Sequence, residues 1–281
     1  VSLACYSVIA AFGVSLNTVV LVSFIKGKLA QPPFPSIYIL VLQTLIVDVI
    51  SISIHLFYWI PKAINQDFLR VPGYDFLIIT IFDFIGMYSW FHNALSHIFI
   101  ASNRFAVIVF FERSFFTRRR VIIMAVAHHL LSFFITLLTQ HGVPCCRLTF
   151  DFEIFSYSSV PNGNMLNYGD LFVTVPVNLL STLTSLICYT TIILTVRSAR
   201  RGSGTVMSQK RKSEYRYALQ FASLAGVFSL CWISFRAFAY FVPSSDPSLA
   251  WIFGLTTGFT MVNCFMNALV YLITNKDVSN S

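Results

Sequence analysis

Seven long, continuously apolar stretches constrain this chain more than any other feature. A helix needs about 20 apolar residues to cross the roughly 30 Å hydrocarbon core of a bilayer. Stretches of that length lie near residues 1–25, 37–60, 76–102, 121–138, 171–196, 217–242 and 249–274. Apolar residues make up 56% of the chain and charged residues only 11%, a composition that excludes an ordinary soluble domain. The sequence therefore predicts an all-α membrane protein, with one domain of seven transmembrane helices.

A transmembrane β-barrel is the first alternative to this fold. Its strands alternate apolar and polar residues, whereas these stretches are apolar throughout. An inverted-repeat transporter is also not expected, because the chain contains no internal repeat.

Positively charged residues gather in alternate loops between the predicted helices. Cytoplasmic loops of membrane proteins carry an excess of Lys and Arg, so we expect the N-terminus outside and the C-terminus inside. The net charge of +8 then follows from topology and from attraction to anionic membrane lipids, and no nucleic-acid partner is expected. The inner side holds Lys26, Lys28, Arg104, Arg113, Arg118, Arg119, Arg120, Arg197, Arg200, Arg201, Lys210, Arg211, Lys212, Arg216 and Lys276; the outer side holds Lys62, Arg70 and Arg147.

Three ionisable residues stand inside the predicted spans, namely Asp48, Asp83 and Arg236. Such residues cost from about 2.5 to above 10 kcal/mol in a bilayer and usually face the interior of the bundle. Asp48 is the strongest functional candidate, because at mid-span it reaches neither interface. The alternatives are a buried, structurally bonded Asp48 and an Arg236 that extends outward to the interface.

The histidines of the third and fourth spans do not indicate a metal site. His92 and His97 are five residues apart, which is a poor spacing for two ligands on one helix face. Structural roles are the preferred interpretation, also for His128 and His129. His92 and Asn93 remain pocket candidates because they lie at mid-span. No cofactor is expected.

Several short patterns occur in the order seen in rhodopsin-like G-protein-coupled receptors, and the chain resembles that superfamily. The matching positions are Asn17 in span one, Asp48 in span two, Asn103-Arg104-Phe105 at the end of span three, Pro176 in span five, Cys231-Trp232-Ile233-Ser234 in span six and Asn267 to Tyr271 in span seven.

The resemblance is closer still to the nematode chemoreceptor family called serpentine receptor class x. The block from Leu95 to Ile108 carries it, together with Pro144-Cys145-Cys146, the segment from Glu214 to Gln220, and the ending NALVYLITN. It covers nearly the whole chain.

The departures from the superfamily concern hinges and cross-links. Ser234 and Ala268 stand where prolines are expected, so the bending of these helices differs. No cysteine lies near the outer end of span three. A disulfide from Cys5 to Cys145 or Cys146 is one option, a bridge between the adjacent pair suits disulfide geometry less well, and free thiols are a third.

The resemblance implies a ligand site in the outer half of the bundle, with Trp232 pointing inward. Arg236 follows four residues later on the same helix face, so it lines the cavity one turn above. We expect Arg236 to anchor an anionic or strongly polar group of the ligand, and either to pair with Asp83 or to leave both charges for the ligand. The full predicted site is Asp83, Tyr88, His92, Trp232, Phe235 and Arg236.

The loop between Cys145 and Leu171 is predicted to cover this site as a β-hairpin. Leu148, Phe150 and Phe152 alternate with polar residues, and turn-forming residues follow. The acidic residues of the loop, Asp151 and Glu153, either attract cations or belong to a solvated strand face.

The inner end of the bundle is predicted to hold a switch between Arg104 and Glu214. Glu214 precedes Trp232 by 18 residues, or five helical turns, and so lies on the same face and level with Arg104. In the superfamily such a pair holds the closed state. The predicted switch residues are Asn103, Arg104, Glu214, Asn267 and Tyr271.

A central polar cluster is predicted in the middle of the bundle, and a structural water network is an equally good interpretation of it. Its residues are Asn17, Asp48, Asn93 and Asn263.

The predicted function is a chemosensory receptor, not an enzyme, in the plasma membrane or the sensory cilia of chemosensory neurons. It would bind a small extracellular ligand and activate a heterotrimeric G protein. An opsin needs a lysine within span seven, and Lys276 lies beyond it. The alternative is an ion channel or transporter that uses Asp48, Asp83 and Arg236.

Overall fold

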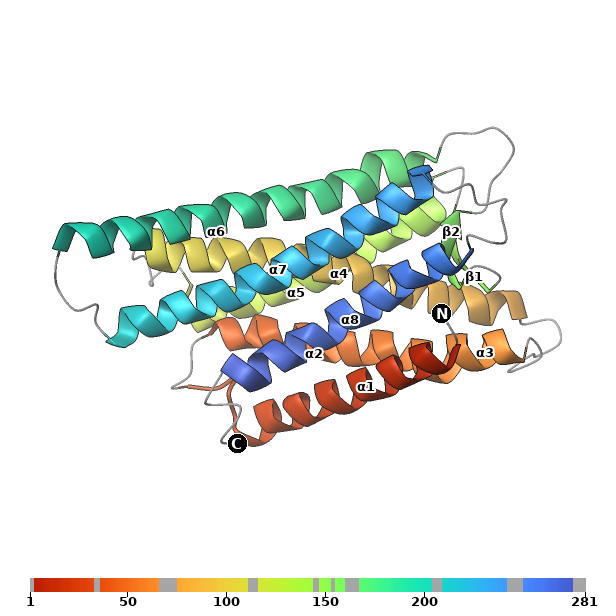
Figure 1. Cartoon of the computed structure of the whole chain (residues 1–281), viewed down its shortest axis with the longest axis horizontal. Coiled ribbons are helices and arrows are strands. Elements are labelled where there is room, and N and C mark those ends of the chain that lie inside the picture. Colours follow the sequence, from red (N-terminus) through yellow and green to blue (C-terminus); the bar gives the residue numbers. More distant parts are fainter. Residues whose placement is uncertain are drawn as a thin grey trace.

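Seven membrane-length helical segments run side by side in the computed structural model (Figure 1). The structure describes residues 3–32, 36–65, 75–110, 116–143, 147–152, 155–159, 167–203, 209–241 and 250–274. The helices are α1 (Leu3–Lys26), α2 (Ile37–Ile54) with its continuations η1 (His55–Trp59) and α3 (Ile60–Ile64), α4 (Asp75–Val109), α5 (Arg118–Leu137) with η2 (Leu138–Gly142), η3 (Asp170–Thr174) with α6 (Val175–Ser203), α7 (Gln209–Phe241) and α8 (Ala250–Thr274). The predicted helical membrane fold is confirmed.

Helix α4 differs from the other six segments, which are each long and apolar enough to cross a membrane by length and composition. It carries Asp83, His92, Asn93 and His97, all buried. The helix contacts α2, α5, α6, α7 and the hairpin strand β1. Its polar side chains therefore face protein rather than lipid, which explains how the least apolar span is tolerated.

The outward faces of the bundle are apolar. Phe134 of α5 and Leu186 of α6 are 59% and 62% exposed, and further leucines and isoleucines surround them. Exposed apolar faces of this extent fit a lipid environment and not water.

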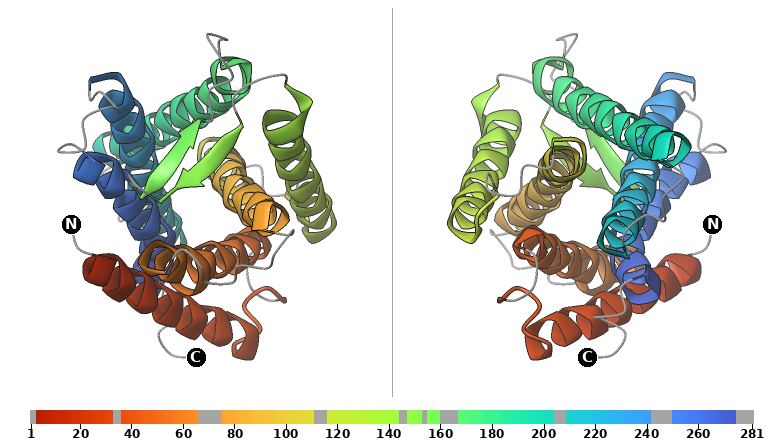
Figure 2. Two further views of the ribbon diagram at one scale, coloured as in Figure 1. Left: turned by 90° about the vertical axis from the view of Figure 1, so that its right-hand side faces the viewer. Right: turned by 90° about the vertical axis from the view of Figure 1, so that its left-hand side faces the viewer.

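A short antiparallel hairpin crosses one end of the bundle (Figure 2). Its strands are β1 (Leu148–Asp151) and β2 (Ser156–Ser159), and Phe150 pairs with Tyr157. Phe150 is 3% exposed and stacks on Trp59 with ring centroids 4.6 Å apart. The predicted β-hairpin is confirmed, but its two strands are joined between Asp151 and Ser156, ahead of the turn expected at residues 161–164. Its apolar face packs into the helices, as the alternating pattern indicated.

Within the described residues, the segments η1, η2 and η3 are π-helical. An extra residue in a helical turn shifts the face that the following side chains present, and such turns are frequent at functional sites. Two of them border the cavity described next, through His55 of η1 and Thr174 of η3.

Candidate ligand cavity beneath the hairpin

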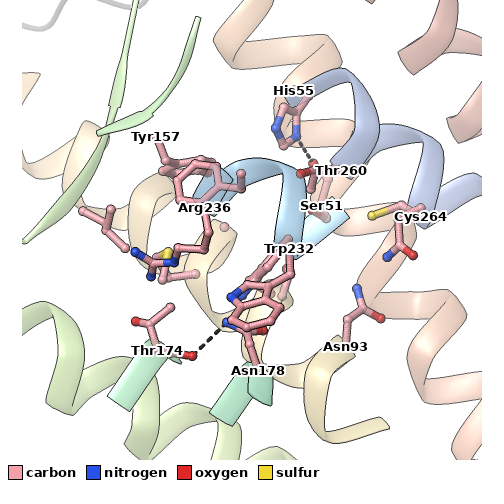
Figure 3. Close-up of a pocket in the computed structure, with 17 residues that line it drawn as sticks. Ser51, His55, Asn93, Tyr157, Thr174, Asn178, Trp232, Arg236, Thr260 and Cys264 are labelled. Carbon is pink, nitrogen blue, oxygen red and sulfur yellow. Dashed lines mark hydrogen bonds between the residues drawn. The ribbon is translucent and has the colours of Figure 1, made fainter. Parts of the chain in front are cut away.

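A cavity lies inside the bundle beneath the hairpin (Figure 3). Its volume is about 70 Å³, several times the roughly 10–15 Å³ that one water needs. A compact molecule is therefore the kind of ligand that it suits. The lining residues are Ser51, His55, Gly86, Met87, Ser89, Trp90, Asn93, Leu148, Tyr157, Thr174, Asn178, Trp232, Phe235, Arg236, Thr260, Asn263 and Cys264.

Helix α7 contributes three of the six predicted ligand residues to the wall. Trp232 and Arg236 line the cavity one turn apart, and Phe235 lies beside them. Their arrangement is the one that the four-residue spacing predicts, and binding of a ligand by these residues stays a prediction.

The charge of Arg236 is matched by Asp170 of η3, not by Asp83. Both terminal nitrogens of the guanidinium donate to the two carboxylate oxygens of Asp170. The side chains of Arg236 and Asp170 are 28% and 21% exposed, so the pair lies towards the outer edge of the cavity. The expected pairing of Arg236 with Asp83 is wrong, because η3 brings a carboxylate closer.

Asp83 instead fastens the hairpin to α4. Its carboxylate accepts a hydrogen bond from Thr149 Oγ1 at 2.6 Å and one from the Phe150 backbone N–H at 3.0 Å. It is only 1% exposed and does not belong to the cavity wall. Asp83 therefore holds the hairpin in place, and its direct contact with a ligand stays a prediction.

The hairpin also bonds to α8 and approaches α4 closely. Thr257 Oγ1 donates to the Phe155 carbonyl at 2.8 Å, and Ser156 and Thr256 hydroxyls lie 3.1 Å apart. Tyr157 lies over Gly86, where a methyl group would overlap the phenol oxygen. Burial raises the pKa of Tyr157 far above its ordinary range, with a further contribution from the Asp83 carboxylate, so the phenol stays neutral.

Tyr88 and His92 lie on the other face of α4, against α5. Tyr88 bonds to His129 at 2.5 Å, and His92 stacks on His128 with ring centroids 4.0 Å apart. His128 bonds to Gln43 and to the His92 carbonyl. Neither Tyr88 nor His92 lines the cavity, and their contact with a ligand stays a prediction. Among the described residues no group of three or more side chains forms a metal site.

The central polar cluster surrounds Asp48. Asn93 donates to one carboxylate oxygen at 3.0 Å and Asn267 to the other at 2.6 Å. Asn17 donates to the carbonyls of Gly13 and Cys264. Asn267, predicted as a switch residue, thus belongs to this cluster.

One predicted member of the central cluster has a different position. Asn263 lies on the cavity wall. Since Asn93 borders both regions, it connects the cavity with Asp48.

Arg104 lies buried at the opposite end of α4, and its guanidinium is 5.1 Å from the centroid of the Phe221 ring in α7. Phe221 in turn contacts Tyr271 at a ring distance of 5.9 Å. Asn103 is buried next to Arg104. The Glu214 side chain lies outside the described residues, and the Arg104–Glu214 contact stays a prediction.

The predicted disulfide is also not tested. Cys5 is exposed near the start of α1, while Cys145 and Cys146 lie outside the described part of the chain.

Comparison with known proteins identifies the family and supports the fold. The family model described as "Serpentine type 7TM GPCR chemoreceptor Srx" matches residues 8–275. The chain belongs to this family. The crystal structure of squid rhodopsin superposes on this Srx chain with a TM-score of 0.77 at 17% identity, covering 100% of this chain and 85% of the rhodopsin. That likeness concerns the fold alone. No match was found among curated proteins.

Among the polar residues of the Srx cavity region that sequence reasoning missed are His55, Asn178 and Asp170. His55 stands seven residues after Asp48, or two helical turns, which was a usable signal. Asn178 stands two residues after the matched Pro176, and Asp170 begins the fifth span at its outer end. Each was visible as a polar residue within or beside an apolar stretch.

Proposed function

We propose that this Srx receptor binds a small extracellular ligand in the cavity and activates a heterotrimeric G protein at the Arg104 end. One observation carries the proposal: α4 and α7 both line the cavity at the hairpin end, and the same two helices meet through Arg104 and Phe221 at the other end. A ligand that changes the position of α7 at the cavity therefore shifts the balance between closed and open arrangements of the far end.

The distribution of charge supports this orientation. Lys26, Arg104, Arg118 and Arg197 belong to the end opposite the hairpin, whereas Lys62 and Arg147 belong to the hairpin end. Cationic residues accumulate on the cytoplasmic side of membrane proteins. The cavity then faces the exterior, and the plasma membrane, including that of sensory cilia, is the proposed location.

The channel or transporter alternative receives no support from the contacts of its three residues. Asp48 bonds to Asn93 and Asn267, Asp83 bonds to the hairpin, and Arg236 bonds to Asp170. The three charged groups thus belong to separate networks instead of one ion path.

Expression with a promiscuous G protein tests the proposal. Cells with the receptor at the surface are screened against volatile and water-soluble nematode metabolites, and calcium release and membrane current are recorded together. We expect at least one compound to give a G-protein signal without current. A ligand-gated current without G-protein dependence would favour the channel instead.

The role of Arg236 is tested with the compound found in this screen. Arg236→Gln removes the charge and the fork of donors, and we expect potency to fall about tenfold, the value of one charge-assisted hydrogen bond. Ser132→Ala is the control, because this α5 hydroxyl bonds only within its own helix to the His128 carbonyl. Equal potencies of Arg236→Gln and the unmodified receptor would remove Arg236 from the ligand site.

A further inference from the structure

Three buried polar side chains of the cavity wall share an unusual property. His55, Asn93 and Asn178 are 4%, 4% and 0% exposed. Each uses one polar atom in a hydrogen bond, and its second polar atom has no partner among the described residues. The unused atoms are His55 Nε2, Asn93 Oδ1 and Asn178 Oδ1. Buried polar atoms are normally bonded, so these three indicate a bound molecule.

The partners of the three side chains fix which atom faces which way. His55 Nδ1 contacts the Ser51 carbonyl at 2.9 Å, and Asn178 Nδ2 contacts the Thr174 carbonyl at 2.8 Å (Figure 3). Carbonyls only accept hydrogen bonds, so the side-chain nitrogens are the donors. Asn93 Nδ2 likewise donates to the Asp48 carboxylate at 3.0 Å. The remaining atom of each side chain, with the imidazole neutral, is therefore an acceptor.

The unused nitrogen donors of the wall come from a different helix. Trp232 Nε1 and Arg236 Nε are buried nitrogens without a partner in the described part of the chain, and both belong to α7. The Tyr157 hydroxyl of β2 also lines the cavity without a partner among the described residues, and a hydroxyl can donate or accept. The acceptors belong to η1, α4 and α6. The cavity thus has an accepting side and a donating side, and the donating side is formed by the helix that also contacts Arg104.

Charge does not select the ligand. Arg236 is the charged residue of the lining, and Asp170 already balances it. A carboxylate ligand would meet three acceptors, and an ammonium would find no carboxylate among the lining residues. A purely apolar molecule would leave the three acceptors, the two nitrogen donors and the Tyr157 hydroxyl without partners.

We infer that the ligand is a compact, uncharged molecule with at least two N–H or O–H donors and one carbonyl-type acceptor. The donors bond to His55, Asn93 and Asn178, and the acceptor bonds to Trp232 and Arg236. This inference rests on the proposed function of the cavity and names its ligand class. Such a molecule joins α7 to the rest of the wall by hydrogen bonds.

The experiment uses the purified full chain in detergent and a panel of small probes. Acetamide, propanamide and lactamide carry the required donors and acceptor. Their N,N-dimethyl analogues keep the carbonyl and lose the amide donors, and for lactamide the hydroxyl is also methylated. Thermal unfolding is recorded as a function of probe concentration. We expect concentration-dependent stabilisation by the donor-bearing probes and at least tenfold weaker binding of the methylated ones.

Two variants locate the contacts. Asn178→Leu and His55→Phe each remove an acceptor while retaining size, and each is expected to weaken probe binding about tenfold. Ser132→Ala is the matched control for removal of a buried polar group outside the cavity. His55→Phe keeps the test decisive if Asn178→Leu does not fold.

Each result decides for or against the inference. It is overturned if methylated probes bind as well as their parents, if no amide stabilises the receptor, or if both variants bind as the unmodified chain does. Because this assay contains no G protein, binding without cellular signalling would defeat the proposed function and leave the ligand class intact. Signalling by a ligand without N–H or O–H donors would support the proposed function and overturn the inferred ligand class.

Discussion

The two ends of α4 each bury one charged residue, but they hold it in different ways. Asp83 accepts two hydrogen bonds from β1, one of them from backbone. Arg104, in contrast, has among its contacts the face of the Phe221 ring. Both residues are almost fully buried, at 1% and 3% exposure. Hydrogen bonds to a carboxylate fix distance and direction, whereas a cation above a ring tolerates lateral movement.

This difference suits a receptor in which one end keeps its shape and the other changes. The hairpin end must preserve a cavity of defined polarity. The Arg104 end must exchange partners when α7 moves. A comparison of variants at the two ends should therefore separate loss of stability from gain of ligand-free activity.

The largest effect is expected from Asp83→Ala. It leaves the Thr149 hydroxyl and the Phe150 N–H without their acceptor in a buried site, which lowers the free energy of unfolding by about 2–5 kcal/mol. Thermal unfolding of the purified receptor measures this. Asp151→Ala is the control, because that carboxylate is only half-buried and its bond from the Ser158 hydroxyl is long, at 3.4 Å. Equal losses in the two variants would mean that Asp83 has no special part in holding the hairpin.

Gly86→Ala tests the packing of the hairpin against α4, at the same end of the bundle. The added methyl group overlaps the Tyr157 hydroxyl, and we expect a loss of about 1–3 kcal/mol from this overpacking. Tyr157→Phe removes the oxygen and should restore most of the loss in the double variant. A double-mutant cycle by thermal unfolding gives the coupling, and additive effects would contradict the close approach.

Phe221→Leu tests the Arg104 end and should affect activity more than stability. Loss of the ring removes a contact worth about 0.5–2 kcal/mol, and we expect ligand-free G-protein signalling to rise several-fold. Phe221→Tyr keeps the aromatic face and serves as the control. Lower stability without any rise in basal signalling would assign Phe221 to packing alone.

The smallest effect is expected from Glu214→Ala. If Glu214 pairs with Arg104, its removal raises basal signalling, and by less than Phe221→Leu because a pair near the cytoplasmic surface is screened by water and salt. Signalling is compared at equal surface expression. A basal level identical to that of the unmodified receptor would count against a pairing of Arg104 with Glu214.

Local periodicity predicted the helices, the hairpin and one wall of the cavity. Trp232 and Arg236 share a face because they are four residues apart, and that relation holds wherever the helix is placed. The alternation in β1 likewise predicted that Phe150 faces the helices. These features depend on neighbours in the sequence.

The errors came from the rotation of helices relative to one another. Gly86, Asn93 and neighbouring positions line the cavity, while Tyr88 and His92 face α5. Residues 92 and 93 differ by about 100° around the helix, so grouping His92 with Asn93 in one pocket conflicted with helical geometry. The spacing of four between Tyr88 and His92 indicated a second face.

Local sequence patterns could not predict which carboxylate pairs with Arg236. Asp170 is 66 residues distant, and the π-helical segment η3 determines where its carboxylate points. A π-helical turn is set by tertiary packing as much as by sequence. The same holds for His55 in η1, whose position on the wall follows from the local geometry of that segment.

The Asp83 contact also bears on how the receptor can be produced. Helix α4 contains no cysteine, so its link to the hairpin forms by hydrogen bonding as the chain folds and requires neither an oxidant nor a disulfide isomerase. The contact between the hairpin and α4 should form in a reducing cell-free translation system and should withstand added dithiothreitol during purification. The choice of hosts for preparing the protein is therefore wider.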